Sequence, residues 1–572
     1  MATEISVDKK TIEEFLKDAQ KKPFLIPEYQ RQYSWEKEHV VTLFEDLTDF
    51  TERKMVLKNN ESYFLGVIVY FENNGQREII DGQQRITSLL LFLRAVYSKL
   101  NENIQKNVKE ENFIKLIEPL IWKQNELTGK VNKNKILIDS KVVIAQDNDT
   151  FHRILKTAEL DYKAKDRYSK NFIEFARLFD DYCKTKPMRV YNFINNILRH
   201  TIVLPIKADN QETALTIFST LNDRGLSLND ADIFKAQIYN SIKNETDKAD
   251  FIDKWKDLEQ KANKNGEKMT GLFYNYMFLL RAKKDDKDTT TPQLRRYLSK
   301  DKYEVIKDKS LLSNLNEILK ITSFSKNFSD INDETWKENV KIKQIFNLLN
   351  LIGNEWWKYP CIIYYLTHKN KKSFELDYLK FLRRLYVEIF MRYSIEHAIN
   401  SLKFPILKLN IQILKSMKPK FEFKEISDVE NKILKDRIKN PHNNLRYSLV
   451  VFIAYLKQNE LLPFDFELEH IFPRKWDNNY LANTLGFTDE KVKECIWNIG
   501  NLTPLEKKLN IRAGNGYFSQ KIKEYQKSKV KITNEIADNF TDFTPEDIIA
   551  RNNELVKSVM CKFNEWKEEY EN

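Results

Sequence analysis

The chain reads Tyr63-Phe64-Leu65-Gly66-Val67-Ile68-Val69-Tyr70-Phe71, then Asn73-Asn74-Gly75, then Arg77-Glu78-Ile79-Ile80-Asp81. A run of apolar and aromatic residues bounded by turn-forming residues predicts a buried β-strand. Asn74-Gly75 tolerates the positive φ angles of a tight turn, so the segment after it is expected to return as an antiparallel strand. Such a hairpin would place Asp81 at the end of its second strand.

Directly after this hairpin the spacing of the apolar residues changes to three and four. The residues at that spacing are Ile86, Leu89, Leu90, Leu93, Val96, Tyr97 and Leu100. This pattern predicts a helix with a buried face. The pentapeptide Asp81-Gly82-Gln83-Gln84-Arg85 therefore lies between a strand and the start of a helix, where unpaired backbone N–H groups and the helix dipole favour an anion such as phosphate.

The side chains of the pentapeptide could add to such a site. Arg85 offers a planar cation, the two glutamines can donate or accept hydrogen bonds, and Asp81 can hold a magnesium ion or polarise a water molecule. The alternative is that Asp81 and Gly82 only form the turn while the other three side chains are solvated. Upstream, Tyr29-Gln30-Arg31 belongs to an aromatic and arginine-rich run that can stack on a base and pair with a phosphate, or can simply cover a core.

The rest of the chain is dominated by helical patterns. A helical run ends near Asn222-Asp223-Arg224-Gly225 and a new helix follows it; residues 241–435 show only helical stripes and charged loops. The pattern of apolar and polar residues changes again near residue 436. We therefore expect an α+β, mostly helical protein with three domains, residues 1–240, 241–435 and 436–572, the middle one a helical linker.

Composition narrows the function classes. The 572 residues are 42% hydrophobic and 31% charged, with a net charge of +11 that favours nucleic acid over membrane as a partner. We find neither a signal peptide nor a run of about 18 apolar residues, so a cytoplasmic location is expected. The four cysteines are isolated from one another, which argues against a disulfide framework and against a thiolate zinc site.

A second group of polar residues, Glu469-His470, Asn501 and Asn510, is found near the C-terminus. A ββα-metal nuclease needs a general base that activates water and a divalent ion that stabilises charge on the phosphate and the leaving oxygen. His470 can be that base, and the oxygen donors Glu469 and Asn510 suit Mg²⁺ or Mn²⁺ better than zinc. The alternative is a structural histidine beside an acid.

Lysines follow this group, beginning with Lys521. They could contact DNA phosphates, or they could form a solvated face of a helix, and charge patterning does not decide between the two. Lys521 is the residue that we assign to DNA contact.

Four motifs occur in order and together resemble a known family: Ile26-Pro27-x-Tyr29-Gln30-Arg31-x-Tyr33-x-Trp35, Phe64-Leu65-Gly66, Ile80-Asp81-Gly82-Gln83-Gln84-Arg85 and Phe218-x-x-Leu221-Asn222-x-Arg224-Gly225-x-x-Leu228. They are similar to the N-terminal domain of GmrSD-type restriction systems, which is related to the ParB-like fold. The resemblance implies that an NTP, GTP or another, is bound and hydrolysed at Asp81, Gly82, Gln83, Gln84 and Arg85, with Tyr29, Gln30, Arg31, Asn222 and Arg224 nearby.

The C-terminal motifs resemble the HNH-type nuclease domain of the same proteins. In that scheme Asn501 braces the loop that carries His470, and the catalytic set is His470, Glu469, Asn501 and Asn510. The sequence departs from the commoner nuclease signature because the leading acid is Glu469 rather than Asp and Asn510 replaces the closing His. Asn515 competes with Asn510 for the role of metal ligand.

Together the two resemblances imply an antiphage restriction endonuclease. Its expected partner is modified DNA, of the glucosylated hydroxymethylcytosine or the phosphorothioate class, and its expected cofactors are an NTP and Mg²⁺ or Mn²⁺. The alternative is a nucleotide-switched DNA-binding protein without nuclease turnover. Backbone contacts do not separate RNA from DNA, and the sequence is silent on oligomeric state.

Overall fold

The computed structural model describes residues 6–57, 61–102, 107–142, 145–159, 166–222, 230–301, 303–324, 339–463, 465–477 and 487–572. They form two compact units, Met1–Ile252 and Asp253–Asn572. Helices dominate and a mixed sheet lies in the first unit, so the expected α+β, mostly helical class is confirmed. In the described parts of the chain, no helix has the length and apolar character needed to cross a membrane.

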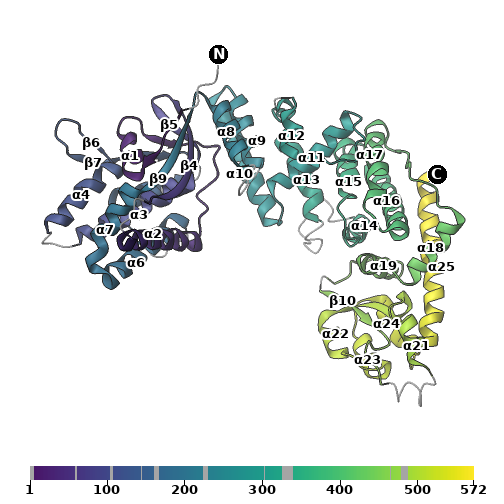
Figure 1. The fold of residues 1–572 in the computed structure, drawn as a ribbon. Helices are drawn as coiled ribbons and strands as arrows, with labels where there is room; N and C mark the ends of the chain where they lie inside the picture. The colour runs from purple at the N-terminus through teal and green to yellow at the C-terminus, as the bar shows by residue number, and fades with distance from the viewer. Residues whose placement is uncertain are drawn as a thin grey trace. The chain divides into compact units, whose positions relative to one another are not determined.

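The first unit is built on a seven-stranded sheet (Figure 1). The strand order is β1-β9-β4-β5-β3-β8, and β2 pairs with β9 as well. β4 runs parallel to β9 and antiparallel to β5. The strands are β1 Ser6–Val7, β2 Lys10–Thr11, β3 Phe24–Ile26, β4 Tyr63–Asn73, β5 Gln76–Asp81, β8 Ile138–Ser140 and β9 Thr201–Ala208.

The predicted hairpin is the centre of this sheet. Asn73 is opposite Gln76, and the two residues between them, Asn74 and Gly75, have φ angles of +48° and +76°. Two successive positive φ angles give a turn whose twist matches that of the flanking strands. The sequence therefore predicted both strands, the turn and the position of Asp81 at the end of β5.

Helices pack around the sheet and form the core of the first unit. The predicted helix is α3, and its buried residues surround the whole helix rather than one face. Phe92 of α3 contacts three rings from α6 and α7, Phe175, Phe179 and Phe193. The helices are α1 Ile12–Lys17, α2 Lys37–Leu57, α3 Gln83–Asn101, α4 Val108–Ile121, α5 Ala145–Thr157, α6 Arg167–Thr185, α7 Val190–His200, α8 Gln211–Asn222 and α9 Asp230–Ser241; a short hairpin joins β6 Trp122–Gln124 and β7 Val131–Ile136, and α10 Glu245–Lys264 spans the unit boundary.

The second unit combines helices with a two-stranded sheet. Its helices are α11 Met269–Lys283, α12 Leu294–Ser299, α13 Leu311–Phe324, α14 Val340–Asn350, α15 Lys358–His368, α16 Phe374–Glu396, α17 Asn400–Lys415, α18 Asp428–Lys439, α19 Asn443–Tyr455, α21 Asp489–Cys495, α22 Lys507–Ala513, α23 Phe518–Tyr525, α24 Lys531–Asn539 and α25 Pro545–Glu571. The strands β10 Phe466–His470 and β11 Leu502–Glu506 pair antiparallel. The long helix α25, yellow in Figure 1, packs on α16 and on the 3₁₀ turn Ile499–Asn501.

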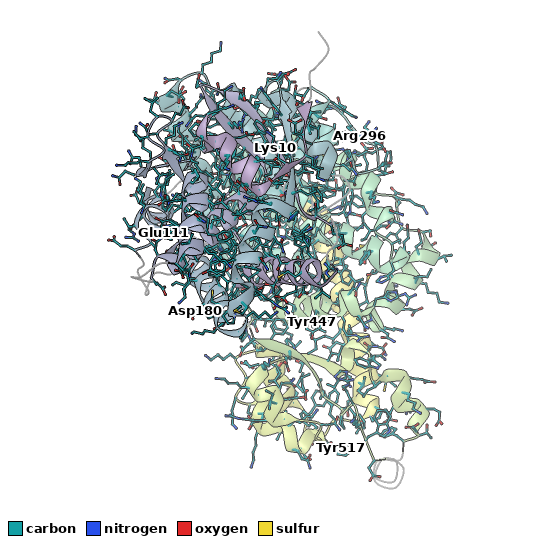
Figure 2. The ribbon with its side chains drawn as sticks, turned by 60° about the vertical axis from the view of Figure 1, so that its left-hand side comes forward. Lys10, Glu111, Asp180, Arg296, Tyr447 and Tyr517 are labelled. Atoms are coloured by element: carbon teal, nitrogen blue, oxygen red, sulfur yellow. The ribbon has the colours of Figure 1, made fainter. Side chains whose placement is uncertain are left out.

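This packing places the expected helical linker and the expected nuclease segment in one compact unit. In Figure 2, Tyr447 on α19 and Tyr517, which precedes α23, mark the part of the second unit that carries β10 and β11. The expected pair of helices around residue 225 is present as α8 and α9, while residues 223–229 lie outside the described residues.

Two candidate functional sites

A glycine makes the turn between β5 and α3. Gly82 has a φ angle of +92°, and a Cβ at this position would lie only 2.9 Å from Cγ1 of Ile68. α3 begins at Gln83 without a side-chain cap, so its first backbone N–H groups have no side-chain acceptor from the preceding residue. This is the arrangement in which the start of a helix binds anions.

A second glycine makes room for Arg85. Gly66 on β4 has a φ angle of +133°, and a Cβ there would lie 2.8 Å from Nη1 of Arg85. That nitrogen donates a hydrogen bond of 2.6 Å to the carbonyl of Val67. The Phe-Leu-Gly motif of β4 and the Arg of the α3 motif are therefore parts of one packed arrangement.

Asp81 lies in the same small electrostatic site. Burial raises the pKa of its carboxyl group, while the positive charge of Arg85, the N–H of Gly82 and the charge of Arg31 oppose that rise. Arg31 itself is exposed. One carboxylate and two guanidinium groups thus surround the uncapped start of α3.

The glutamines of the motif hold the upstream segment in place. The amide of Gln84 donates to the carbonyl of Gln32 at 3.1 Å and accepts from the backbone N–H of Ser34 at 2.7 Å. Gln83 donates to Oε1 of Gln30 at 3.3 Å. Because these buried amides are already engaged, they fix the shape of the site, and Asp81, Arg85 and Arg31 are its charged groups.

For the remaining residues of the predicted nucleotide site, the structure gives fewer contacts. Tyr29 is buried, with its ring 5.5 Å from that of Tyr239. Asn222 is the last residue of α8, but its side chain is outside the described part, as is the whole of Arg224. Their assignment to the nucleotide site stays a prediction.

The second candidate site lies where β10 ends. His470 pairs with Leu502 in the two-stranded sheet. The fully buried Asn501 holds the chain just beyond His470: its Oδ1 accepts from the N–H of Phe472 at 2.7 Å, and its Nδ2 donates to the carbonyls of Phe472 and Ile496 at 3.2 and 3.0 Å. One amide side chain therefore ties together two segments of the loop region around His470.

Gly500, the first residue of the Gly-Asn-Leu turn, packs directly against α25. A Cβ at this position would lie 2.1 Å from the carbonyl oxygen of Ile548 on α25. From the same helix, Arg551 donates to the carbonyls of Gly500 and Leu502 at 2.7 and 3.1 Å. The turn can lie directly against α25 because glycine has no side chain.

His470 is buried, and among the described residues its Nε2 has no hydrogen-bond partner. Its ring meets the ring of Trp497 edge-on, with the centroids 4.7 Å apart. Burial, and then the positive charges of Arg474, Lys521 and Arg446, lower the pKa of His470 to about 3. The imidazole is therefore neutral at physiological pH, as a proton acceptor must be.

Two arginines converge on the same tryptophan. The guanidinium of Arg446 lies 4.5 Å from the centroid of the Trp497 ring, and that of Arg474 lies 5.2 Å from it. Nε of Arg446 is buried without a partner in the described structure, and burial lowers the pKa of this side chain. Trp497 keeps 37% of its surface exposed. Two cations thus lie beside the candidate base on a surface that solvent reaches.

Glu469 is not free. Its Oε1 lies 2.7 Å from Nζ of Lys521 and accepts a hydrogen bond of 2.9 Å from Tyr525. Burial raises the pKa of Glu469 and lowers that of Lys521, and their mutual attraction opposes both shifts. Lys521 is only 1% exposed and also donates to the carbonyl of His470 at 2.5 Å. The expected phosphate contact of Lys521 is replaced in this structure by a buried ion pair.

The expected pair of metal ligands is arranged differently from the prediction. Asn510 donates to Oε2 of Glu467 at 2.7 Å, so its observed partner is Glu467 rather than Glu469. Asn515, the competitor for the ligand role, bonds in both directions to the backbone of Lys475. Among the described residues no three His, Cys, Asp or Glu side chains gather as metal ligands.

Oxygen donors are present on β10, although the carboxylate of Glu469 is already paired with Lys521. Glu467 and Glu469 are two residues apart on β10 and therefore share one face of the strand. Asn510 lies beside Glu467, to which it donates a hydrogen bond through its Nδ2. Mg²⁺ commonly uses one or two carboxylates and completes its coordination with water and substrate phosphate.

Sequence reasoning missed the arginine pair and Glu467. Arg474 directly follows Pro473 of the histidine motif, so its position next to that motif could have marked it. Arg446 lies on α19, outside every motif, and nothing local distinguishes it from other surface arginines. Only the packing of α19 against β11 brings it to the site.

Comparison with known proteins agrees with the motifs at both ends of the chain. The model of the GmrSD restriction endonuclease N-terminal domain matches residues 12–239, and that of the C-terminal domain matches residues 423–558. The chain therefore belongs to the GmrSD restriction endonuclease family. It is also 23% identical over 361 residues, 60% of its length, to an uncharacterized protein of Methanocaldococcus jannaschii. The chain spans about half the length of this curated relative, 55% of which is covered.

The buried ion pair yields a direct test. Replacing Lys521 by Met leaves the carboxylate of Glu469 buried without its cation, which should destabilise this part of the unit by about 3–5 kcal/mol. Hydrogen exchange of the β10 and β11 amides, followed by mass spectrometry, should become faster. Adding Glu469→Gln to that variant should restore part of the protection, because no buried charge then remains.

Lys523→Met is the matched control, because Lys523 is an exposed lysine on the same helix. It should leave the exchange of β10 and β11 unchanged. Exchange in Lys521→Met as slow as in the unmodified protein would show that the ion pair does not hold the site together.

Proposed function

We propose that this chain is a DNA endonuclease of a restriction system and that His470 is its general base. The observation that carries the proposal is the buried, unpartnered Nε2 of His470 beside a tryptophan that two arginines contact. A base needs a neutral nitrogen with no competing donor, and a phosphodiester needs cations around its oxygens. Membership of the GmrSD family supports the same reaction.

The proposed step is hydrolysis of a phosphodiester bond. The oxygen of a water molecule forms a bond to phosphorus and its proton passes to Nε2 of His470. The bond from phosphorus to the leaving oxygen breaks, and that oxygen keeps the electron pair and takes a proton from water. Arg446 and Arg474 hold the phosphate oxygens and stabilise the charge that they gain. Asn501 keeps His470 in position through the backbone of residues 471 and 472.

Mg²⁺ or Mn²⁺, when bound, would neutralise charge on the phosphate and on the leaving oxygen. Glu469 and Asn510 remain the proposed ligands, and we propose Glu467, the hydrogen-bond partner of Asn510 two residues before Glu469 on β10, as a third oxygen donor. We propose that β10, β11 and the following helix α22 form the ββα-metal, HNH-type element of this domain.

The first unit is proposed to be a ParB-like domain that binds and hydrolyses an NTP, GTP or another. The support is the uncapped start of α3 with Asp81, Arg85 and Arg31 around it. Its second proposed role, recognition of glucosylated or phosphorothioated DNA, rests on the family resemblance. Nucleotide and modified DNA are therefore the proposed partners of the chain.

Cleavage assays test the nuclease proposal. Unmodified, cytosine-glucosylated and phosphorothioated DNA of one sequence should be incubated with Mg²⁺ or Mn²⁺, with and without NTP. We expect cutting of at least one modified DNA, loss of cutting in EDTA, and a loss of about 100-fold or more in His470→Ala, because a general base contributes at least that much. Nucleotide turnover by His470→Ala should be unchanged, which shows that the variant is folded.

No cutting of any substrate, together with retained DNA binding, would contradict the nuclease proposal. It would instead favour the nucleotide-switched DNA-binding protein. The neutralisation of Glu469 by Lys521 is the feature of the structure that agrees with this second reading.

The arginine pair generates a separate prediction. Arg446→Ala should lower kcat by about 100-fold, the usual loss when one donor to a developing negative charge is removed. Arg446→Lys should recover only part of it, since lysine keeps the charge but not the planar fork. Arg437→Ala, an exposed arginine on α18, is the matched control, and equal rates for it and Arg446→Ala would exclude Arg446 from the reaction.

The nucleotide site has its own test. Asp81→Ala and Arg85→Ala should weaken NTP binding in equilibrium titration and reduce phosphate release, because they remove the two charged groups at the start of α3. His470→Ala should bind NTP as the unmodified chain does. Unchanged binding and turnover in Asp81→Ala would show that the nucleotide site lies elsewhere.

A further inference from the structure

A groove of about 830 Å³ lies in the second unit, away from the residues assigned above. Lys341, Gln344, Ile345 and Leu348 face it from α14, where their spacing of three and four defines one face of the helix. α25 contributes a similar stripe that includes Lys557, Cys561, Lys562 and Trp566. Arg383 of α16 and the end of α19, with the turn that follows it, complete the lining.

The lining carries excess positive charge. Five basic residues and two acidic residues contribute to it: Lys341, Arg383, Lys457, Lys557 and Lys562, with Glu554 and Glu565. Three of the cations have carboxylate partners: Arg383 pairs with Glu569, Lys457 with Glu535 and Lys562 with Glu565. In the described structure, neither Lys341 nor Lys557 has a carboxylate within ion-pair distance.

Lys341 lies close to other positive charges of the groove lining. Burial lowers its pKa, the charges of Arg383 and Lys562 lower it further, and the charge of Glu460 opposes the shift. Its Nζ donates a hydrogen bond of 2.6 Å to the neutral Oδ1 of Asn459. An amide oxygen satisfies the geometry of an ammonium group but supplies no negative charge, so Lys341 is a cation without an adjacent carboxylate.

Two buried N–H groups at the groove also lack acceptors. Trp566 is 6% exposed, and its Nε1 has no hydrogen-bond partner among the described residues; the same is true of Nε of Arg383. The guanidinium of Arg383 lies over the Trp566 ring, 5.3 Å from its centroid. A buried donor without an acceptor costs about 1–3 kcal/mol. Unpaired donors and unneutralised cations together indicate an anionic ligand with several oxygen atoms.

We propose that this groove binds phosphate groups of a nucleic-acid backbone. The groove is open to solvent, and cations line it from three helices and from the turn after α19, whereas its aromatic side chains, Trp566, Phe452 and Tyr455, are buried or half-buried. Cations that neutralise successive phosphates are the usual source of affinity for nucleic acid. The proposal does not depend on His470, because a chain without nuclease turnover would bind DNA here in the same way.

The thiol of Cys561 can serve as a chemical probe of whether the groove is occupied. It is exposed and lines the groove, whereas Cys361 and Cys495 are buried and Cys183 is half-buried. The rate of Cys561 alkylation by N-ethylmaleimide can be measured by peptide mass spectrometry on the full chain in EDTA. A 20-base-pair duplex should slow the reaction several-fold, and the double variant Lys341→Glu, Lys557→Glu should abolish that protection.

The salt dependence of DNA binding supplies an independent readout. Removing one lysine that contacts a phosphate should reduce the slope of log K against log salt by about 1. Lys341→Ala and Lys557→Ala should each show that reduction. Lys435 is an exposed lysine of α18 outside the groove, so Lys435→Ala is the matched control. Its slope should equal that of the unmodified chain.

Parallel alkylation with ATP, with GTP and with inorganic phosphate separates the sources of phosphate. If only the duplex protects Cys561 from alkylation, and the lysine variants show the reduced slopes, the ligand is the phosphate backbone of nucleic acid. Protection by a nucleotide but not by the duplex would overturn the backbone as source and assign the groove to a free nucleotide. Unprotected Cys561 with all ligands, and unaltered slopes in both lysine variants, would overturn the phosphate site itself.

Discussion

The ion pair between Glu469 and Lys521 is the constraint around which the C-terminal site is arranged. Lys521 meets the carboxylate at 2.7 Å and the carbonyl of His470 at 2.5 Å, so one buried ammonium holds both the acid and the backbone of the adjacent histidine. A buried carboxylate without such a cation would be strongly unfavourable. Tyr525 from the same helix completes the cluster with a hydrogen bond to Glu469. The position of the candidate base thus depends on the packing of α23 beneath β10.

Three glycines allow the close backbone contacts that position both candidate sites. Gly66 leaves space for the guanidinium of Arg85, and Gly82 lets β5 pass directly into α3. Gly500 does the same where the turn before β11 lies against α25, with only 2.1 Å between its hypothetical Cβ and a carbonyl oxygen. In each place a main chain approaches another group more closely than any Cβ would permit.

The three sites share an electrostatic design. Each contains cations that outnumber the carboxylates beside them: Arg31 and Arg85 at the start of α3, Arg446 and Arg474 at Trp497, and Lys341 and Lys557 of the groove. Unpaired cations carry a repulsion that an arriving anion relieves, and this relief adds to the binding of a polyanion.

The sequence by itself determined the local structure: the hairpin with its Asn74-Gly75 turn, the helix after Gly82, the mostly helical class and the family. These features rest on φ preferences, apolar spacing and motif order, all of which act between near neighbours in the chain. The tertiary structure alone decided that Lys521 is buried against Glu469, that Asn510 meets Glu467, and that α19 brings Arg446 to Trp497. Those contacts join residues far apart in sequence, and whether a lysine is solvated or paired depends on which helix face is buried, which no local pattern records.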